Sequence, residues 1–304
     1  MPFGHCSTAA LGRTRRTGLM GMKILLTGGS GFIGSHLAQE LQSRGYDVKI
    51  FDRETGSDVT NPQDVLDAAS DCDAIFNLAG VLGTHELNEG GQISKAVQVN
   101  VLGALNCLEA ARTLKVKLLQ IAKPNLWLNT YSITKRASED FTKLYCKEHS
   151  VQAWIVRWFN VFGPGQHYGV PQKLAPTAIV RALKGLPVQI FGDGTQTVDH
   201  IYVKDAVRAT VDIFECDRVT GIPVEVGSGD DMSVREFIDL VLKHTNSKSR
   251  IEFLPMRHGE DERSVVRADI TLLHAKVGFA PRFPIERAIA ETVDYYRQHL
   301  GEYQ

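Results

Sequence analysis

The chain has 304 residues, of which 43% are hydrophobic and 23% charged, a composition typical of a globular protein with one large or two small domains. Its formal net charge of −1 at pH 7 offers no attraction for nucleic acid or an anionic membrane surface, so a small-molecule partner is expected. The five cysteines are scattered and form neither a C-x-x-C pair nor a zinc pattern, which is typical of a reducing, cytoplasmic environment.

The first 21 residues precede any structural pattern. They carry arginines but no following apolar segment of secretory type, so they are expected to be a disordered extension, with Met20 or Met22 as alternative starts. No apolar run in the whole sequence approaches the roughly 18 residues of a membrane span.

The segment from Lys23 to Leu37 predicts a strand, a tight turn and a helix. Gly28 permits the sharp turn, Gly31 lets backbone N–H groups approach a pyrophosphate, and Gly34 lets the helix pack closely on the strand. The start of the helix adds partial positive charge, so this turn is expected to bind the phosphates of a dinucleotide. Ser30, Phe32 and Ile33 are further candidate cofactor contacts in the same turn.

The next strand, over 47–51, is followed by Asp52. This acid lies about 20 residues beyond the glycines, where a ribose needs a hydrogen-bond acceptor. Its carboxylate would repel a 2′-phosphate, which predicts NAD rather than NADP, although Arg53 beside it is able to pair with such a phosphate. Asp58 and Val59 are expected to flank the adenine, and Leu78, Ala79 and Gly80, at the end of a strand over 74–80, to line the cofactor crevice.

Strands and helices continue to alternate, which predicts a doubly wound parallel sheet of the Rossmann type with a smaller C-terminal α/β lobe. The expected elements are a long helix over 96–115, a strand over 116–122, a helix from 131 to about 149, a strand over 187–192 and amphipathic helices over 233–243 and 285–296. Ser233 and Glu236 form a capping-box pattern at the start of the first of these amphipathic helices.

Tyr131 and Lys135 are four residues apart and therefore share one face of the predicted helix. An ammonium group beside a phenol favours the phenolate and lowers the pKa of the tyrosine. Such a tyrosine is suited to act as acid or base at a sugar hydroxyl or ketone.

From Lys23 to about Asp269 the chain resembles the extended short-chain dehydrogenases/reductases, in particular the nucleotide-sugar epimerases and dehydratases such as the UDP-glucose 4-epimerases. The matching segments are TGGSGFIG (27–34), NLAG (77–80), VNVLG (99–103), YSITK (131–135), RWFNVFGPGQ (157–166), GDGTQTVDHIYVKD (192–205) and MRHGE (256–260).

The resemblance implies a catalytic pair, a substrate site and a dimer. By position, Tyr131 and Lys135 resemble the catalytic pair, and Lys135 and Asn100 are expected near the cofactor. The expected substrate contacts are Asn160, Lys173, Gln189 and Arg257. The resemblance also implies a homodimer through helices at about 97–112 and 132–147, with Val101, Leu105, Leu108, Phe141, Leu144 and Tyr145 on the paired faces.

Two positions depart from the family pattern. The strand before the catalytic helix ends Ile121-Ala122-Lys123-Pro124-Asn125, without the Ser or Thr that hydrogen-bonds the reacting sugar oxygen, and Val198 stands where an arginine is expected. Lys123, Asn125 and Thr130 are local candidates to replace the missing donor. Asn125 is favoured, because a neutral donor would not compete with Lys135 for the phenolate.

The sequence therefore predicts an NAD-dependent epimerase of a nucleotide-diphosphate sugar. Its expected parts are the extension over 1–21, an NAD-binding domain over 22–165 with returns near 197–217, and a mainly nucleotide-sugar-binding lobe over 166–304. A reductase or dehydratase of a nucleotide keto-sugar, and a dinucleotide-binding regulatory protein without activity, are the alternatives.

Overall fold

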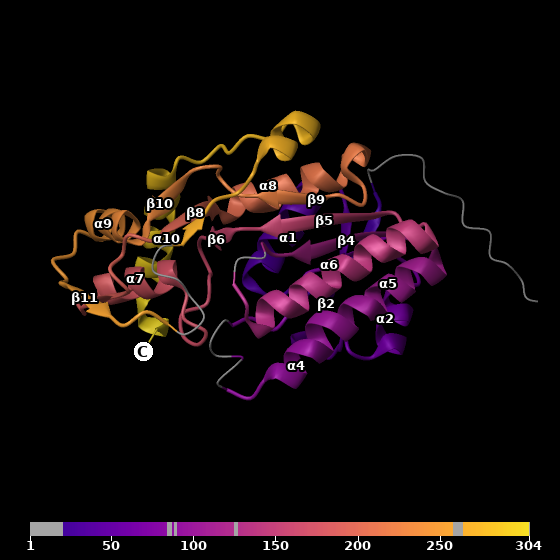
Figure 1. Ribbon diagram of the computed structural model, residues 1–304, viewed down its shortest axis with the longest axis horizontal. Helices are drawn as coiled ribbons and strands as arrows, with labels where there is room; N and C mark the ends of the chain where they lie inside the picture. The colour runs from indigo at the N-terminus through magenta and orange to yellow at the C-terminus, as the bar shows by residue number, and fades with distance from the viewer. Residues whose placement is uncertain (1–20, 84–86, 88–89, 125–126, 258–263, 304) are drawn as a thin grey trace, which may run out of the picture.

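The computed structural model describes residues 21–83, 87, 90–124, 127–257 and 264–303, and it confirms the predicted α/β fold (Figure 1). A parallel six-stranded sheet has the order β2-β1-β3-β4-β5-β9. Its strands are β1 (Lys23–Thr27), β2 (Asp47–Phe51), β3 (Ala74–Asn77), β4 (Lys117–Ala122), β5 (Ala153–Trp158) and β9 (Pro223–Val226).

Helices cover both faces of this sheet, because its strands are apolar on both sides. Ile24 and Leu26 pack with α1 (Phe32–Ser43) and α8 (Val203–Phe214), whereas Leu25 between them packs on the opposite face. That opposite face is covered by α2 (Pro62–Ala69), α5 (Gly103–Leu114) and α6 (Thr130–His149). All three strand residues are fully buried, as expected for a central parallel strand.

The predicted helix over 96–115 is divided into three helical segments. These are α4 (Ile93–Val97), the π-helical turn η2 (Gln98–Leu102) and α5. The wider turn contains Asn100, whose buried side chain hydrogen-bonds to the loop after β3 and to α6. Apolar periodicity alone did not indicate this change of helix type, and Ala96, Asn100 and Ala104 are buried here whereas Val97 is exposed.

The C-terminal lobe contains two small sheets and three helices. One sheet has β8 (Thr197–Tyr202) paired with β6 (Asn160–Phe162), β10 (Asp231–Ser233) and β12 (Val265–Val266). The other joins β7 (Val188–Phe191) to β11 (Ile251–Leu254). The helices are α7 (Leu174–Leu183), α9 (Val234–Thr245) and α10 (Ile285–Gln298). Short helical turns elsewhere along the chain are η1 (Arg53–Thr55) after β2, η3 (Asp217–Val219) after α8, η4 (Leu273–Val277) and η5 (Leu300–Glu302). The predicted capping box is present at the start of α9.

The expected return near 197–217 contains one strand and one helix, β8 and α8. Strand β8 belongs to the C-terminal lobe, whereas α8 packs on α1 and leads to β9 at the sheet edge. Core residues from both lobes, including Phe162, Phe214 and Phe237, belong to one hydrophobic cluster. The domain limits themselves stay a prediction, since the two lobes share this core.

Gly34 determines how closely α1 approaches the turn after β1. A Cβ at this position would overlap the carbonyl oxygen of Gly28 and lie 2.8 Å from the Cα of Gly29, and neither backbone atom is the end of a flexible side chain. The helix packs this closely on the turn because residue 34 has no side chain.

We expect Gly34→Ala to lower the free energy of unfolding by about 1–3 kcal/mol, because the added methyl forces backbone apart. Denaturant unfolding of the variant and wild type measures this difference. Gly301→Ala is the matched control, since a Cβ at Gly301 meets nothing within 4 Å. Equal stabilities of Gly34→Ala and wild type would contradict the close packing.

Candidate active site

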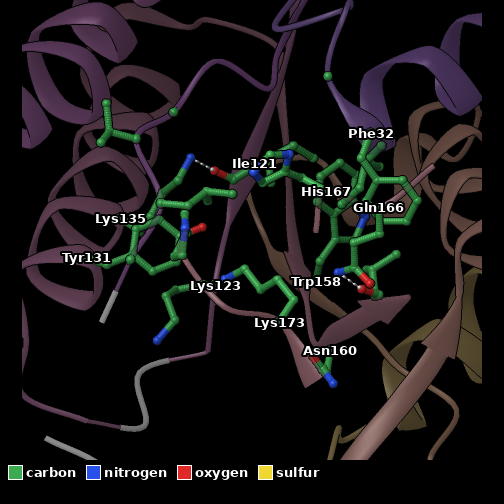
Figure 2. A pocket seen from close by; sticks show the side chains of 18 of the residues that line it. Phe32, Ile121, Lys123, Tyr131, Lys135, Trp158, Asn160, Gln166, His167 and Lys173 are labelled. Carbon is green, nitrogen blue, oxygen red and sulfur yellow. Dashed lines mark hydrogen bonds between the residues drawn. The ribbon is translucent and has the colours of Figure 1, made fainter. Parts of the chain in front are cut away.

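A cavity of about 680 Å³ lies between the carboxyl edge of the large sheet and the C-terminal lobe (Figure 2). The predicted cofactor residues on its wall are Gly28, Gly31, Phe32, Ile33, Gly34, Asp52, Asp58, Val59, Leu78, Ala79, Gly80, Tyr131 and Lys135. The predicted substrate residues Asn160, Lys173, Gln189 and Arg257 line the same cavity. Ser30 and Asn100 do not line it, and Asn125 lies outside the described residues.

The turn between β1 and α1 leaves backbone exposed to the cavity. Gly28 has φ +69°, and a Cβ there would lie 2.9 Å from the backbone nitrogen of Ala79. Gly31 is the residue before the first turn of α1, and both glycines line the cavity. A helix N-terminus without side chains in front of it fits a pyrophosphate, so the residues present suit a dinucleotide.

Asp52 joins this turn to the end of β2. One carboxylate oxygen accepts a hydrogen bond from the backbone N–H of Ser30 at 3.1 Å, and the other accepts one from the backbone N–H of Glu54 at 3.2 Å. Ser30 thus supports the carboxylate through its backbone N–H and is not among the lining residues, and its contact with a cofactor stays a prediction. The carboxylate of Asp52 is half-buried and lines the cavity. It can therefore accept hydrogen bonds from the ribose hydroxyls of a dinucleotide.

A line of buried side chains crosses the sheet beneath the cavity. The hydroxyl of Thr27 donates to Asn77, the amide of Asn77 donates to Gln120, and the amide of Gln120 donates to the carbonyl of Ile121, each at 2.8–2.9 Å. The ammonium of Lys135 also donates to this carbonyl, at 3.3 Å (Figure 2). Gln120 was not among the predicted site residues, although a polar residue within an apolar strand is a signal that a buried partner exists.

Asn100 positions the cavity wall and does not line it. Its amide accepts from the N–H of Val81 at 2.8 Å and donates to the carbonyl of Val81 and to the hydroxyl of Thr134. A Cβ on Gly80 would lie 3.3 Å from both this amide oxygen and the ammonium of Lys135. The amide of Asn100 thus supports the loop after β3, and its direct contact with the cofactor stays a prediction.

Tyr131 and Lys135 project from the first turns of α6 into the cavity. The side chain of Asn129 caps this helix by accepting from the N–H of Ser132 at 2.9 Å. Burial raises the pKa of the Tyr131 phenol and lowers the pKa of Lys135 to about 8. The lowered pKa expected for Tyr131 is therefore wrong for the free protein, because desolvation dominates and the ammonium of Lys135 donates to a backbone carbonyl.

Lys123 occupies the end of β4, where the family pattern has a hydroxyl side chain. Its ammonium donates to the hydroxyl of Ser132 at 2.8 Å and lies 5.6 Å from the ring centroid of Tyr131. Burial, followed by the positive charge of Lys173, lowers the pKa of Lys123 to about 8. Of the three candidate donors, Lys123 lines the cavity, Thr130 does not, and Asn125 is outside the described residues.

The opposite wall comes from the C-terminal lobe. The amide of Asn160 lies 2.8 Å from Nδ1 of His200, a fully packed imidazole whose pKa is lowered to about 3 by burial. The guanidinium of Arg257 stacks on Phe191, 4.3 Å from the ring centroid. This wall also contains aromatic and amide side chains that were not among the predicted site residues, namely Trp158, Gln166, Phe191 and Gln196.

The burial of the Lys135 ammonium at the cavity wall lowers the stability of the folded protein. Its pKa falls from 10.5 to about 8, so between these values the unfolded chain binds more protons at this group than the folded one. The burial penalty is therefore fully present below about pH 8 and is relieved as the pH rises toward 10.5.

We expect Lys135→Met to raise the melting temperature of the cofactor-free protein at neutral pH, by a few degrees. The difference from wild type should narrow near about pH 10. Thermal unfolding at the two pH values checks this, with Lys147→Met as the control because the Lys147 side chain is 82% exposed. A lower melting temperature at neutral pH would mean that the bond to Ile121 outweighs the burial penalty.

Comparisons with known proteins agree with this geometry. The family model of the NAD dependent epimerase/dehydratase family matches residues 24–122 and 126–227. The chain is 30% identical to a UDP-N-acetyl-alpha-D-glucosaminuronate decarboxylase of Bacillus cytotoxicus, over 92% of this chain and 99% of that protein. Among the helices of the described ranges, none has the length and apolar character required to cross a membrane.

Two solved structures share the fold over nearly their whole length. The UDP-glucuronic acid 4-epimerase of Bacillus cereus, in complex with UDP-glucuronic acid and NAD, is 26% identical with a TM-score of 0.83 and covers 91% of this chain and 100% of its own. The UDP-glucose 4-epimerase of Thermotoga maritima with UDP-glucose is 25% identical with a TM-score of 0.83, covering 92% and 100%. The chain therefore belongs to the NAD-dependent epimerase/dehydratase family and is an NAD-dependent enzyme.

Proposed function

We propose that the protein is an epimerase of a nucleoside diphosphate sugar that acts through a transient keto-sugar. The observation that carries the proposal is that Tyr131 and Lys135 line the same cavity as the glycine turn at one end and Asn160 and Arg257 at the other. The bound sugar would then lie between a dinucleotide site and a site for the diphosphate. NAD, when bound at the glycine turn, supplies the hydride acceptor and donor for the sugar carbon.

Tyr131 is the proposed acid and base. As the phenolate, its oxygen takes the proton of the sugar hydroxyl as the carbon is oxidised, and the resulting phenol returns it when the carbon is reduced on its other face. The buried ammonium of Lys135 favours the phenolate electrostatically and orients the ribose next to it. Asn160 and Arg257 bind the diphosphate and hold the sugar against Tyr131. Asn125, as donor to the reacting oxygen, stays a prediction.

The net reaction is tested by the mass and redox balance of the product. Epimerisation leaves the mass of the nucleotide-sugar unchanged and consumes no NAD, whereas dehydration removes water, decarboxylation releases carbon dioxide and reduction consumes NADH. Incubation with UDP-sugars followed by mass spectrometry and NMR of the product separates these outcomes. We expect a stereoisomer of unchanged mass, and a product of different mass would contradict the proposal.

Tyr131→Phe should lower kcat by about 10²- to 10⁴-fold, because the ring still packs but no longer carries a proton acceptor. Titration calorimetry should give an unchanged NAD affinity. Tyr46→Phe is the matched control, since the Tyr46 hydroxyl donates to Glu215 away from the cavity. More than about a tenth of the wild-type rate in Tyr131→Phe would assign the proton transfer to another group.

We also propose that two chains associate through α6 and the neighbouring helical segments α4 and η2. Of the expected interface residues, Leu108 and Tyr145 pack in the core, so they do not form a paired face. The apolar side chains exposed on these helices are Ile93, Val97, Leu102, Ile133 and Leu144, between 40% and 55% exposed. They lie on α4, η2 and α6, which run along one side of the molecule (Figure 1).

Light scattering at micromolar concentration should give twice the chain mass of 33.6 kDa. Ile133→Glu should shift the protein toward the monomer, because it places a charge within the apolar face. Leu186→Glu is the control, since Leu186 is 42% exposed in the turn between α7 and β7. A monomer mass for wild type, or an unchanged dimer in Ile133→Glu, counts against this interface.

A further inference from the structure

His200 lies behind the cavity wall of the C-terminal lobe, next to Asn160. The two residues are paired in the register between β6 and β8. Asn160 lines the cavity, whereas His200 is only 4% exposed (Figure 2). Val198, two residues earlier on β8, lines the cavity where the family pattern has an arginine. Strand β8 therefore contributes an apolar residue to the wall itself, and His200 is connected to the wall through its hydrogen bond with Asn160.

The direction of this hydrogen bond follows from the chemistry of the amide. Nδ2 of Asn160 lies 2.8 Å from Nδ1 of His200, and an amide nitrogen only donates, so Nδ1 is the acceptor. Burial lowers the pKa of His200 to about 3, so the imidazole is neutral at neutral pH and carries its proton on Nε2. The bond uses one amide hydrogen of Asn160, and the other N–H and the carbonyl oxygen are left for a ligand.

Packing alone does not explain an imidazole at this position. The ring stacks on Phe237 with 4.3 Å between the centroids, and it meets Phe162 edge-on at 6.1 Å. Nε2 is buried and has no hydrogen-bond partner among the residues that the structure describes. An unpaired buried N–H is costly, so a phenyl ring would suit the same aromatic surroundings better. What the imidazole supplies and a phenyl ring lacks is the acceptor at Nδ1.

We propose that His200 is a positioning residue of the substrate site, whose Nδ1 holds the amide of Asn160 in the orientation that binds the diphosphate of a nucleoside diphosphate sugar. The proposal rests on the function proposed above, in which Asn160 binds the diphosphate. A diphosphate oxygen accepts a hydrogen bond from the remaining N–H of this amide. An amide that is already fixed loses less conformational freedom on binding than one that rotates, so the acceptor at Nδ1 increases the affinity.

The test compares UDP binding, measured by titration calorimetry, with thermal unfolding in two variants. His200→Phe should weaken UDP binding about 3- to 10-fold, because Asn160 loses its acceptor. Its melting temperature should equal or exceed that of wild type, since the ring still packs and the unpaired N–H is gone. His200→Asn should show the reverse. Its Oδ1 replaces Nδ1 as acceptor, so UDP affinity should stay within about 2-fold of wild type, while the loss of aromatic packing lowers the melting temperature.

A double-mutant cycle tests whether His200 acts through Asn160. Asn160→Ala should weaken UDP binding about 10-fold, and adding His200→Phe should change it by less than about 2-fold further, because the amide is already absent. His299→Phe is the matched control, since His299 also stacks on an aromatic ring, Tyr295, and hydrogen-bonds through Nδ1, but lies after the end of α10. It should keep the wild-type UDP affinity, and NAD affinity should be unchanged in every variant.

The outcomes separate the two proposals. If His200→Phe binds UDP as tightly as wild type, if it weakens binding equally with and without the Asn160 amide, or if His200→Asn restores nothing, the positioning role is wrong and the epimerase proposal is unaffected. If wild type does not bind UDP, or if Asn160→Ala binds it as tightly as wild type, the proposed diphosphate contact fails and the role of His200 fails with it. His200→Leu carries the same comparison if His200→Phe is unfolded.

Discussion

The chain of buried hydrogen bonds from Thr27 through Asn77 and Gln120 to the carbonyl of Ile121 is the interaction on which the cavity depends. It joins β1, β3 and β4 at the edge where each strand ends, and Thr27 also accepts from the backbone N–H groups of Leu78 and Ala79. The carboxyl ends of parallel strands lie at the same edge of a sheet, and the backbone hydrogen bonds between the strands stop there. These side chains hold the ends in register, so the glycine turn and Lys135 keep a constant separation.

The same network connects stability to chemistry. Lys135 donates to the carbonyl that Gln120 already uses, and Gly80 leaves room for its ammonium beside Asn100. The side chains of Asn100, Gln120 and Lys135 are buried, where an unsatisfied polar atom is costly, so the network orients its members strongly. A lysine held in this way destabilises the free fold, and it lines the same cavity as Tyr131.

The cavity separates charge along its length. Asp52 and Asp58 lie at the end of β2 and beyond it, whereas Lys123, Lys135 and Lys173 lie near Tyr131 and the junction of the lobes. Arg53 also lines the cavity beside Asp52, so the acidic end is not purely negative.

The sequence by itself determined the parts that depend on local pattern. Apolar runs, three glycines and the acid after the second strand specified the Rossmann sheet, because backbone sterics and burial act on neighbouring residues. Four-residue spacing placed Tyr131 and Lys135 on one face of a helix for the same reason. The tertiary structure alone decided which of these groups the cavity wall contains, since Asn100 turned inward to support Val81 while Lys123 faced the cavity. It also decided the direction of the Tyr131 pKa shift, because desolvation is set by all the elements packed around a phenol, and no spacing along the chain records them.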